Sequence, residues 1–172
     1  LNRRRFTLGF RALAAAPVLA QARSGEARVL EFNHLHTGET LEVEYFAAGR
    51  YLPDALGAVN HLLRDFRNGD IGTMDPALLD LLHALRAQTG SRKPYQIISG
   101  YRSPATNRML HERSSGVATK SLHMSGQAID IRVADVPLAQ LRTAALSLQR
   151  GGVGFYPGSD FVHVDTGRVR AW

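Results

Sequence analysis

The chain has 172 residues, of which 44% are hydrophobic and none is cysteine. This length suits one domain with a core of its own, and the lack of cysteine excludes disulfides, thiolate metal ligands, a cysteine nucleophile and a lipoprotein anchor. The formal net charge is +6, but residues 1–22 hold four arginines and no acidic residue, so the remainder carries +2 (6 − 4).

This weak positive charge bears on the partners of the chain. The remainder contains neither a basic stripe nor a known nucleic-acid module, so we expect no nucleic-acid partner. A mildly basic surface instead favours an anionic polymer as substrate.

Residues 1–22 are predicted to be an export signal. Arg3, Arg4 and Arg5 precede an apolar stretch, and Ala20-Gln-Ala22 offers a small-x-small cleavage site. The arginines, followed by Phe and Leu, resemble a twin-arginine signal. We therefore expect a periplasmic protein without a stable membrane anchor after cleavage, since no apolar run reaches about 18 residues. The alternative is a basic amphipathic helix that belongs to the fold.

The remaining residues, 26–172, are predicted to form one α+β domain. Apolar alternation predicts a hairpin of strands at 28–32 and 40–46, and apolar stripes predict two helices after it. The first stripe comprises Leu52, Leu56, Val59, Leu63 and Phe66, and the second helix begins after Asp75. Further along we expect strands at 95–99, 128–133, 153–155 and 161–165, helices at 104–110 and 137–148, and an exposed loop at 111–121. Strands and helices in this uneven order predict a mainly antiparallel sheet flanked by helices.

Two segments near the C-terminus carry the chemistry. Ser121 to Asp130 contains His123, and the last predicted strand contains His163. Two imidazoles and a carboxylate are the ligand set of a catalytic zinc site, which leaves a fourth position open. A turn at Gly126 would fold His123 over the strand that presents Asp130. The alternative for His163 is a core histidine that bonds a backbone carbonyl.

The first of these segments, Ser121 to Asp130, resembles a family signature. Ser121-x-His-x-x-Gly-x-Ala-x-Asp130 is similar to the motif of zinc D-Ala-D-Ala metallopeptidases, a superfamily that includes lysostaphin-type peptidases and the hedgehog domain. The closer resemblance is to the YcbK-like murein endopeptidases. It extends from about residue 29 to residue 172 and includes the blocks His36–Glu39, Ile98–Ser103, Gly151–Gly154 and Phe161–Gly167.

The resemblance implies a hedgehog-like fold in which His123, Asp130 and His163 bind one zinc ion per chain. It also implies an exported endopeptidase that cuts peptide cross-links in peptidoglycan, and we expect a monomer. Two other functions stay open: a carboxypeptidase or dipeptidase on D-Ala-terminated peptides, and a non-catalytic wall-binding domain that keeps the zinc.

The resemblance also suggests the residues that assist the reaction. Related enzymes place an acidic base three positions before the last histidine ligand, which is Asp160 here. Asp165 is the rival because it shares a strand face with His163; otherwise it orients a ligand. Arg102 resembles the arginine that stabilises the oxyanion, or else forms a loop salt bridge. Ser121 resembles a substrate-contacting serine, or else caps a turn.

The pair His34 and His36 has the spacing of metal ligands as a bare pattern. Nothing in the sequence links it to the other histidines, so we predict a structural role for it.

Overall fold

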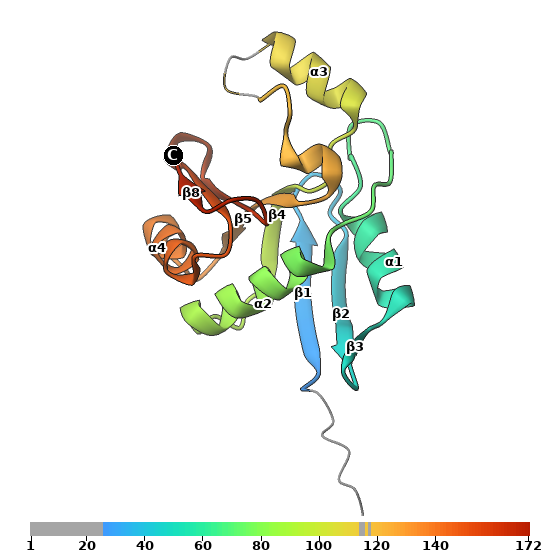
Figure 1. Cartoon of the computed structure of the whole chain (residues 1–172), viewed down its shortest axis with the longest axis vertical. Helices are drawn as coiled ribbons and strands as arrows, with labels where there is room; N and C mark the ends of the chain where they lie inside the picture. The colour runs from blue at the N-terminus through green and yellow to red at the C-terminus, as the bar shows by residue number, and fades with distance from the viewer. Residues whose placement is uncertain (1–25, 114–115, 117) are drawn as a thin grey trace, which may run out of the picture.

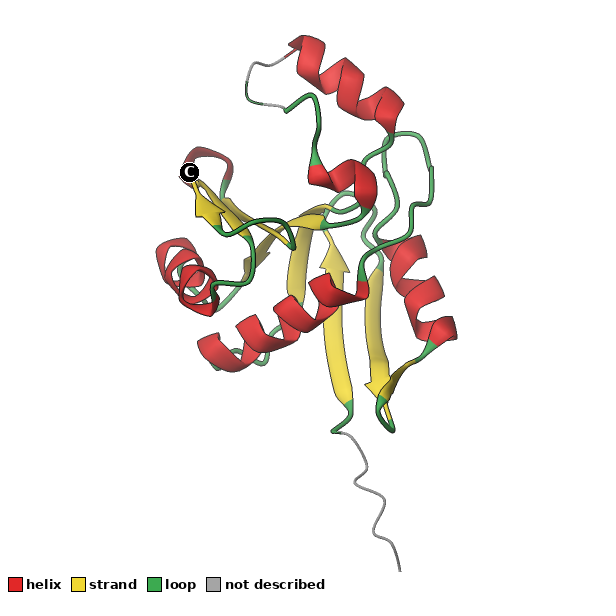
Figure 2. Cartoon of the chain, viewed as in Figure 1, coloured by secondary structure: helices red, strands yellow, loops and turns green. Residues whose placement is uncertain are grey.

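A computed structural model describes residues 26–113, 116 and 118–172, and its centre is an eight-stranded sheet (Figures 1 and 2). The predicted export signal lies outside the described residues. The strand order is β3-β2-β1-β4-β5-β7-β6-β8. Two neighbouring pairs, β1 with β4 and β6 with β8, are parallel, and all other pairs are antiparallel. The predicted α+β fold with a mainly antiparallel sheet is confirmed.

The strands are β1 (Arg28–His34), β2 (Thr40–Ala47), β3 (Arg50–Tyr51), β4 (Tyr95–Ser99), β5 (Ala128–Val133), β6 (Gly152–Tyr156), β7 (Phe161–Asp165) and β8 (Arg170–Ala171). The helices are α1 (Pro53–Leu62), α2 (Pro76–Thr89), α3 (Pro104–Arg113) and α4 (Leu138–Leu148), with 3₁₀ turns η1 (Leu122–Ser125) and η2 (Pro157–Ser159). Within the described part of the chain, no helix has the length and apolarity that a membrane span requires.

Two helices cover one face of the sheet. Helix α2 lies across β1, and α4 lies beside it against β5, β6 and β7 (Figure 1). Alternate residues of β5, Ile129 and Ile131, are fully buried in the core between the sheet and these helices. Because neighbouring residues of a strand point to opposite faces, Asp130 is directed to the other face.

Local sequence signals explain where α2 begins and ends. The side chain of Asp75 accepts a hydrogen bond from the backbone N–H of Ala77, and Pro76 occupies the first turn. Gly90 ends the helix in the left-handed conformation, which glycine adopts without strain. The predicted start of this helix is confirmed.

Helix α1 is shorter than its apolar stripe predicts. It ends at Leu62, and Phe66 instead stacks on His36 with the ring centroids 4.1 Å apart. The cause is Asp65, whose buried carboxylate accepts the backbone N–H groups of Arg67 and Ser103. The carboxylate of Asp65 competes with the helix because it accepts hydrogen bonds from backbone N–H groups that lie outside the helix. The chain therefore turns at this residue.

Gly126 allows the turn that carries His123 to approach its neighbours. Its φ is +67°, and a Cβ added there would collide with the backbone oxygen of Thr73 and lie 2.9 Å from the Cα of Met74. Gly90 has a similar φ of +69° but open space where its Cβ would be. Both glycines therefore have the left-handed backbone conformation, but only Gly126 lies against the backbone of a neighbouring segment.

We predict that Gly126→Ala destabilises the fold more than Gly90→Ala. The left-handed conformation costs an alanine about 1 kcal/mol at either position, and overpacking at residue 126 adds about 1–3 kcal/mol. Equilibrium unfolding in urea measures both losses. Equal losses for the two variants would contradict the close contact at Gly126.

Candidate metal centre

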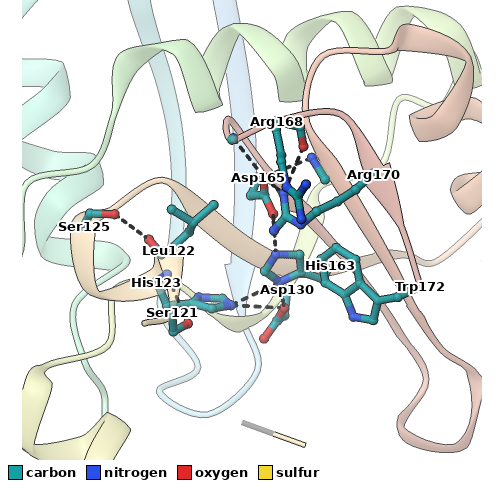
Figure 3. A network of polar contacts seen from close by, with 12 residues as sticks. Ser121, Leu122, His123, Ser125, Asp130, His163, Asp165, Arg168, Arg170 and Trp172 are labelled. Carbon is teal, nitrogen blue, oxygen red and sulfur yellow. Dashed lines mark hydrogen bonds and ion pairs between the residues drawn. The ribbon is translucent and has the colours of Figure 1, made fainter. Parts of the chain in front are cut away.

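Two strands and one turn bring the three predicted metal ligands together (Figure 3). Asp130 on β5 and His163 on β7 are directly paired in the antiparallel register, and His123 lies in the turn η1, whose last cap is Gly126. All three side chains are buried. Each offers one ligand atom, and the three atoms lie within 4.8 Å of one another.

The three ligand atoms are defined by short distances. Nδ1 of His163 lies 2.9 Å from Oδ1 of Asp130, and Nε2 of His123 lies 3.2 Å from Nδ1 of His163 and 3.3 Å from Oδ1 of Asp130. Two ring nitrogens and a carboxylate oxygen that converge in this way form a cation site. The donor set is one that zinc prefers. No second group of potential ligands is found among the described residues.

The second nitrogen of each ring is held by an acceptor. Nδ1 of His123 lies 2.7 Å from the carbonyl oxygen of Gly100, and Nε2 of His163 lies 3.1 Å from Oδ2 of Asp165. A proton on each of these outer nitrogens leaves the lone pairs of the inner nitrogens directed at the centre. Such contacts fix the tautomer and orientation of metal-binding histidines. The residues present therefore fit a bound metal ion.

The electrostatics of the ligands favour a cation. Burial alone would raise the pKa of Asp130, but the charges and hydrogen bonds of His123 and His163 lower it well below the ordinary value of a carboxyl group. Burial alone would lower the pKa of His163, but hydrogen bonds to Asp130 and Asp165 raise it. The centre thus holds an ionised carboxylate and attracts positive charge.

The carboxylate of Asp165 already has several hydrogen-bond partners. Its fully buried carboxylate accepts the backbone N–H groups of Gly152 and Gly167 at 2.9 and 2.8 Å. Arg170 donates to both of its oxygens, at 3.1 and 2.7 Å, and His163 contacts it through the outer nitrogen (Figure 3). This network favours the orienting role for Asp165 over that of a base.

A cavity of about 570 Å³ opens beside the ligand atoms. Cationic, aromatic and small polar side chains surround the three ligands in its wall. The lining residues are Arg102, Gly116, Ala118, Lys120, Ser121, Leu122, His123, Asp130, Tyr156, Ser159, Phe161, His163, Arg170 and Trp172.

Arg102 lies in the wall of this cavity and forms no ion pair within the described part of the chain. Its backbone N–H donates to the carbonyl of His123 at 3.1 Å, and its Nη1 donates to Oδ1 of Asn107 at 3.4 Å. Its Nε is buried and has no partner among the described residues. Burial lowers the pKa of Arg102, and the charge of Asp130 opposes this shift. Donors of the guanidinium thus stay available beside the ligands.

Asp160 does not line the cavity. Its carboxylate forms an ion pair with Arg132 and is 63% exposed, although Ser159 and Phe161 on either side of it are part of the cavity wall. Asp160 lies at the C-terminal cap of η2, before β7 begins, as the turn at this position predicts. The structure therefore places the carboxylate of Asp160 against Arg132 rather than among the residues that line the cavity.

Ser121 and His34 have visible structural roles. Ser121 caps η1, where its hydroxyl accepts the backbone N–H of His123 at 3.4 Å, and it also lines the cavity. Nδ1 of His34 accepts the backbone N–H groups of His36 and Thr37 at 3.3 and 3.4 Å. The predicted structural role of the His34 and His36 pair is confirmed.

The sequence-based prediction does not include several residues of the cavity wall, among them Tyr156, Arg170 and Trp172. Their signal in the sequence is Gly154 inside the predicted strand 153–155, since glycine inside a strand marks a close approach of other groups. The sequence does not indicate which residues lie against this glycine.

The chain is similar to several known proteins. The family model described as Peptidoglycan L,D-endopeptidase MepK matches residues 22–172. The chain is 47% identical to Peptidoglycan L,D-endopeptidase MepK of Escherichia coli K12 over 176 residues, which covers 99% of this chain and 97% of the relative. It is 42% identical to the probable peptidoglycan L,D-endopeptidase MepK of Haemophilus influenzae, covering 90% and 84%. The crystal structure of Serratia marcescens L-Ala D-Glu endopeptidase ChiX matches 45% of this chain and 62% of that chain, with 24% identity and a TM-score of 0.35.

The contact between Asp165 and His163 generates a prediction. Asp165→Asn weakens the hydrogen bond that orients His163 and lowers zinc affinity by about 10-fold to 100-fold, the effect of losing such a partner. Competition with a chromophoric chelator measures this affinity. The matched control is Asp80→Asn, which removes a carboxylate that accepts bonds from Arg28, Tyr45 and Tyr51 at 2.6–2.9 Å and should leave zinc affinity unchanged. Equal zinc affinities in the two variants would contradict the orienting role.

Proposed function

The chain belongs to the MepK family of peptidoglycan L,D-endopeptidases, and from this premise we propose that it is a zinc-dependent enzyme that hydrolyses peptide cross-links of peptidoglycan at a bond between an L and a D centre. The observation that carries the proposal is the convergence of His123, Asp130 and His163 on one point. This arrangement uses three protein ligands and leaves room in the adjoining cavity for a substrate.

The three ligands would hold zinc through Nε2 of His123, Oδ1 of Asp130 and Nδ1 of His163. When bound, zinc polarises the scissile carbonyl and lowers the pKa of water toward about 7. The chain orients the two histidine ligands through the carbonyl of Gly100 and the carboxylate of Asp165, and it buries all three ligand side chains.

Arg102 is proposed to stabilise the negative charge that develops on the carbonyl oxygen. Its guanidinium lies in the cavity wall and keeps a buried Nε without a partner among the described residues. The hydrogen bond to Asn107 holds the side chain in place. A fixed cation in a partly buried site is worth more to a transition state than the same group in water.

Asp160 is proposed as the general base, which accepts a proton from the attacking water and returns it to the leaving amine. Two facts support this choice over Asp165. Both neighbours of Asp160 line the cavity, and its own side chain is 63% exposed in the ion pair with Arg132, so breaking that pair costs about 1 kcal/mol or less. Asp165, in contrast, is fully buried and accepts bonds from four residues.

Ser121 is proposed to contact the substrate with its hydroxyl hydrogen. The hydroxyl oxygen already accepts the N–H of His123, and the residue lines the cavity. A serine hydroxyl can accept one bond and donate another, so the capping role and the substrate contact are compatible.

Peptidoglycan lies outside the cytoplasmic membrane, so the chain acts outside the cytoplasm. We propose that it is periplasmic and exported by the twin-arginine route as a monomer. The arginines and apolar stretch of residues 1–22 support this route. A site assembled from distant segments is also suited to export after folding.

The test of this function is zinc content measured together with cleavage. We expect one zinc ion per wild-type chain. We also expect that the wild type converts cross-linked muropeptide dimers to monomers, which mass spectrometry detects. His123→Ala should lose both, while His83→Ala, in helix α2, should keep both. Release of a terminal D-Ala without dimer cleavage would indicate a carboxypeptidase. Bound zinc with no cleavage would indicate a wall-binding domain.

The proposed base gives a separate prediction. Asp160→Asn should lower kcat by about 10²-fold to 10⁴-fold, the range for loss of a general base, and should leave zinc bound. Arg132→Gln breaks the same ion pair but keeps the carboxylate, so it should retain activity. Full activity of Asp160→Asn, or an equal loss in both variants, would contradict the assignment.

A further inference from the structure

Strand β6 has a glycine opposite a metal ligand. Gly154 pairs directly with His163 on β7, so both positions face the cavity side of the sheet. A Cβ at residue 154 would lie 2.8 Å from the rings of both Trp172 and Tyr156. The glycine therefore leaves a space beside the ligand, and two aromatic side chains fill it.

These two aromatic side chains are joined by a hydrogen bond. Nε1 of Trp172 donates to the hydroxyl oxygen of Tyr156 at 2.7 Å. The indole ring lies 5.3 Å from the ring of His163 (Figure 3), and the guanidinium of Arg170 lies 4.8 Å from the indole centroid. On its other side Tyr156 stacks on Phe161 at 4.6 Å. The phenol is thus held from two sides within the cavity wall.

The hydrogen bond from Trp172 determines what the Tyr156 hydroxyl can do. A phenol has one O–H to donate and an oxygen that accepts. The indole N–H of Trp172 donates to the hydroxyl oxygen of Tyr156. The hydroxyl hydrogen of Tyr156 has no acceptor among the described residues. The hydroxyl hydrogen is therefore available to a substrate in the cavity. Arg102 lies in the wall of the same cavity.

We propose that Tyr156 is a further catalytic residue and that Trp172 is its positioning residue. This role rests on the proposed function. As the water oxygen bonds to the scissile carbon, the carbonyl π electrons move to the carbonyl oxygen. The Tyr156 O–H donates a hydrogen bond to that oxygen beside Arg102, and the proton stays on Tyr156 throughout. Such a donor strengthens as charge develops and therefore acts mainly on the transition state.

The test compares hydroxyl-deleting variants on a cross-linked muropeptide dimer with zinc-loaded protein. Tyr156→Phe should lower kcat by on the order of 10²-fold with KM unchanged, the effect of removing one such donor. Trp172→Phe keeps a ring but removes the N–H, so it should also lower kcat, by a smaller factor. The matched control is Tyr51→Phe, which removes the hydroxyl that donates to Asp80 at 2.7 Å and should leave both constants unchanged.

A binding measurement separates a transition-state role from a structural one. A phosphinate analogue of the cross-link should bind Tyr156→Phe more weakly by about the same factor as the loss in kcat, while the cleaved product peptide should bind as it does to the wild type. Unchanged kcat in Tyr156→Phe, or a raised KM with unchanged kcat, would overturn the catalytic role alone. A wild-type chain that binds zinc and cleaves nothing would overturn the proposed function and this role with it.

Discussion

The antiparallel pairing of β5 with β7 is the constraint on which the site depends. It sets Asp130 directly beside His163 on one face of the sheet. On the other face the same two strands bury Ile129, Ile131 and Val164 in the core. A shift of the register by one residue would move these apolar side chains from the core to the opposite face of the sheet. The energy of core packing therefore also fixes the distance between Asp130 and His163. The metal centre thus needs no separate framework.

Backbone space is the second constraint, and glycines provide it around the centre. Gly126 lets the turn that carries His123 approach the backbone of residues 73 and 74. Gly152 and Gly154 leave room over β6, where Arg170 reaches Asp165 and Trp172 reaches Tyr156. One part of the cavity wall, Arg170 and Trp172, therefore comes from the last described residues, which fold back over a strand that has little side chain of its own on this face.

Much of this arrangement could be predicted because it follows from local patterns. The strands at 128–133 and 161–165 and the three metal ligands are visible in short motifs, and alternation predicts which face of β5 Asp130 occupies. The rest depends on contacts between distant residues. The end of α1 is set by Asp65 bonding the backbone of Ser103, and the two-residue strands β3 and β8 are too short to show a period.

For Asp160 and Trp172, too, the sequence shows the local position, whereas the contacts depend on the tertiary fold. The sequence places Asp160 in the turn before β7, but its ion pair with Arg132 becomes visible only when β5 and β7 lie side by side. Trp172 is 16 positions from Tyr156 and meets it because β8 pairs with β6. Motifs thus identify the three residues whose ligand atoms converge, and the tertiary fold identifies the residues that line the cavity beside them.

The most direct test of the central claim is a crystal structure of the protein loaded with zinc, with anomalous differences measured at the zinc edge. The account predicts one strong peak at about 2.0–2.2 Å from Nε2 of His123, Oδ1 of Asp130 and Nδ1 of His163, with the outer nitrogens still bonded to Gly100 and Asp165. A peak elsewhere, or one that lacks any of these three ligands, would contradict it.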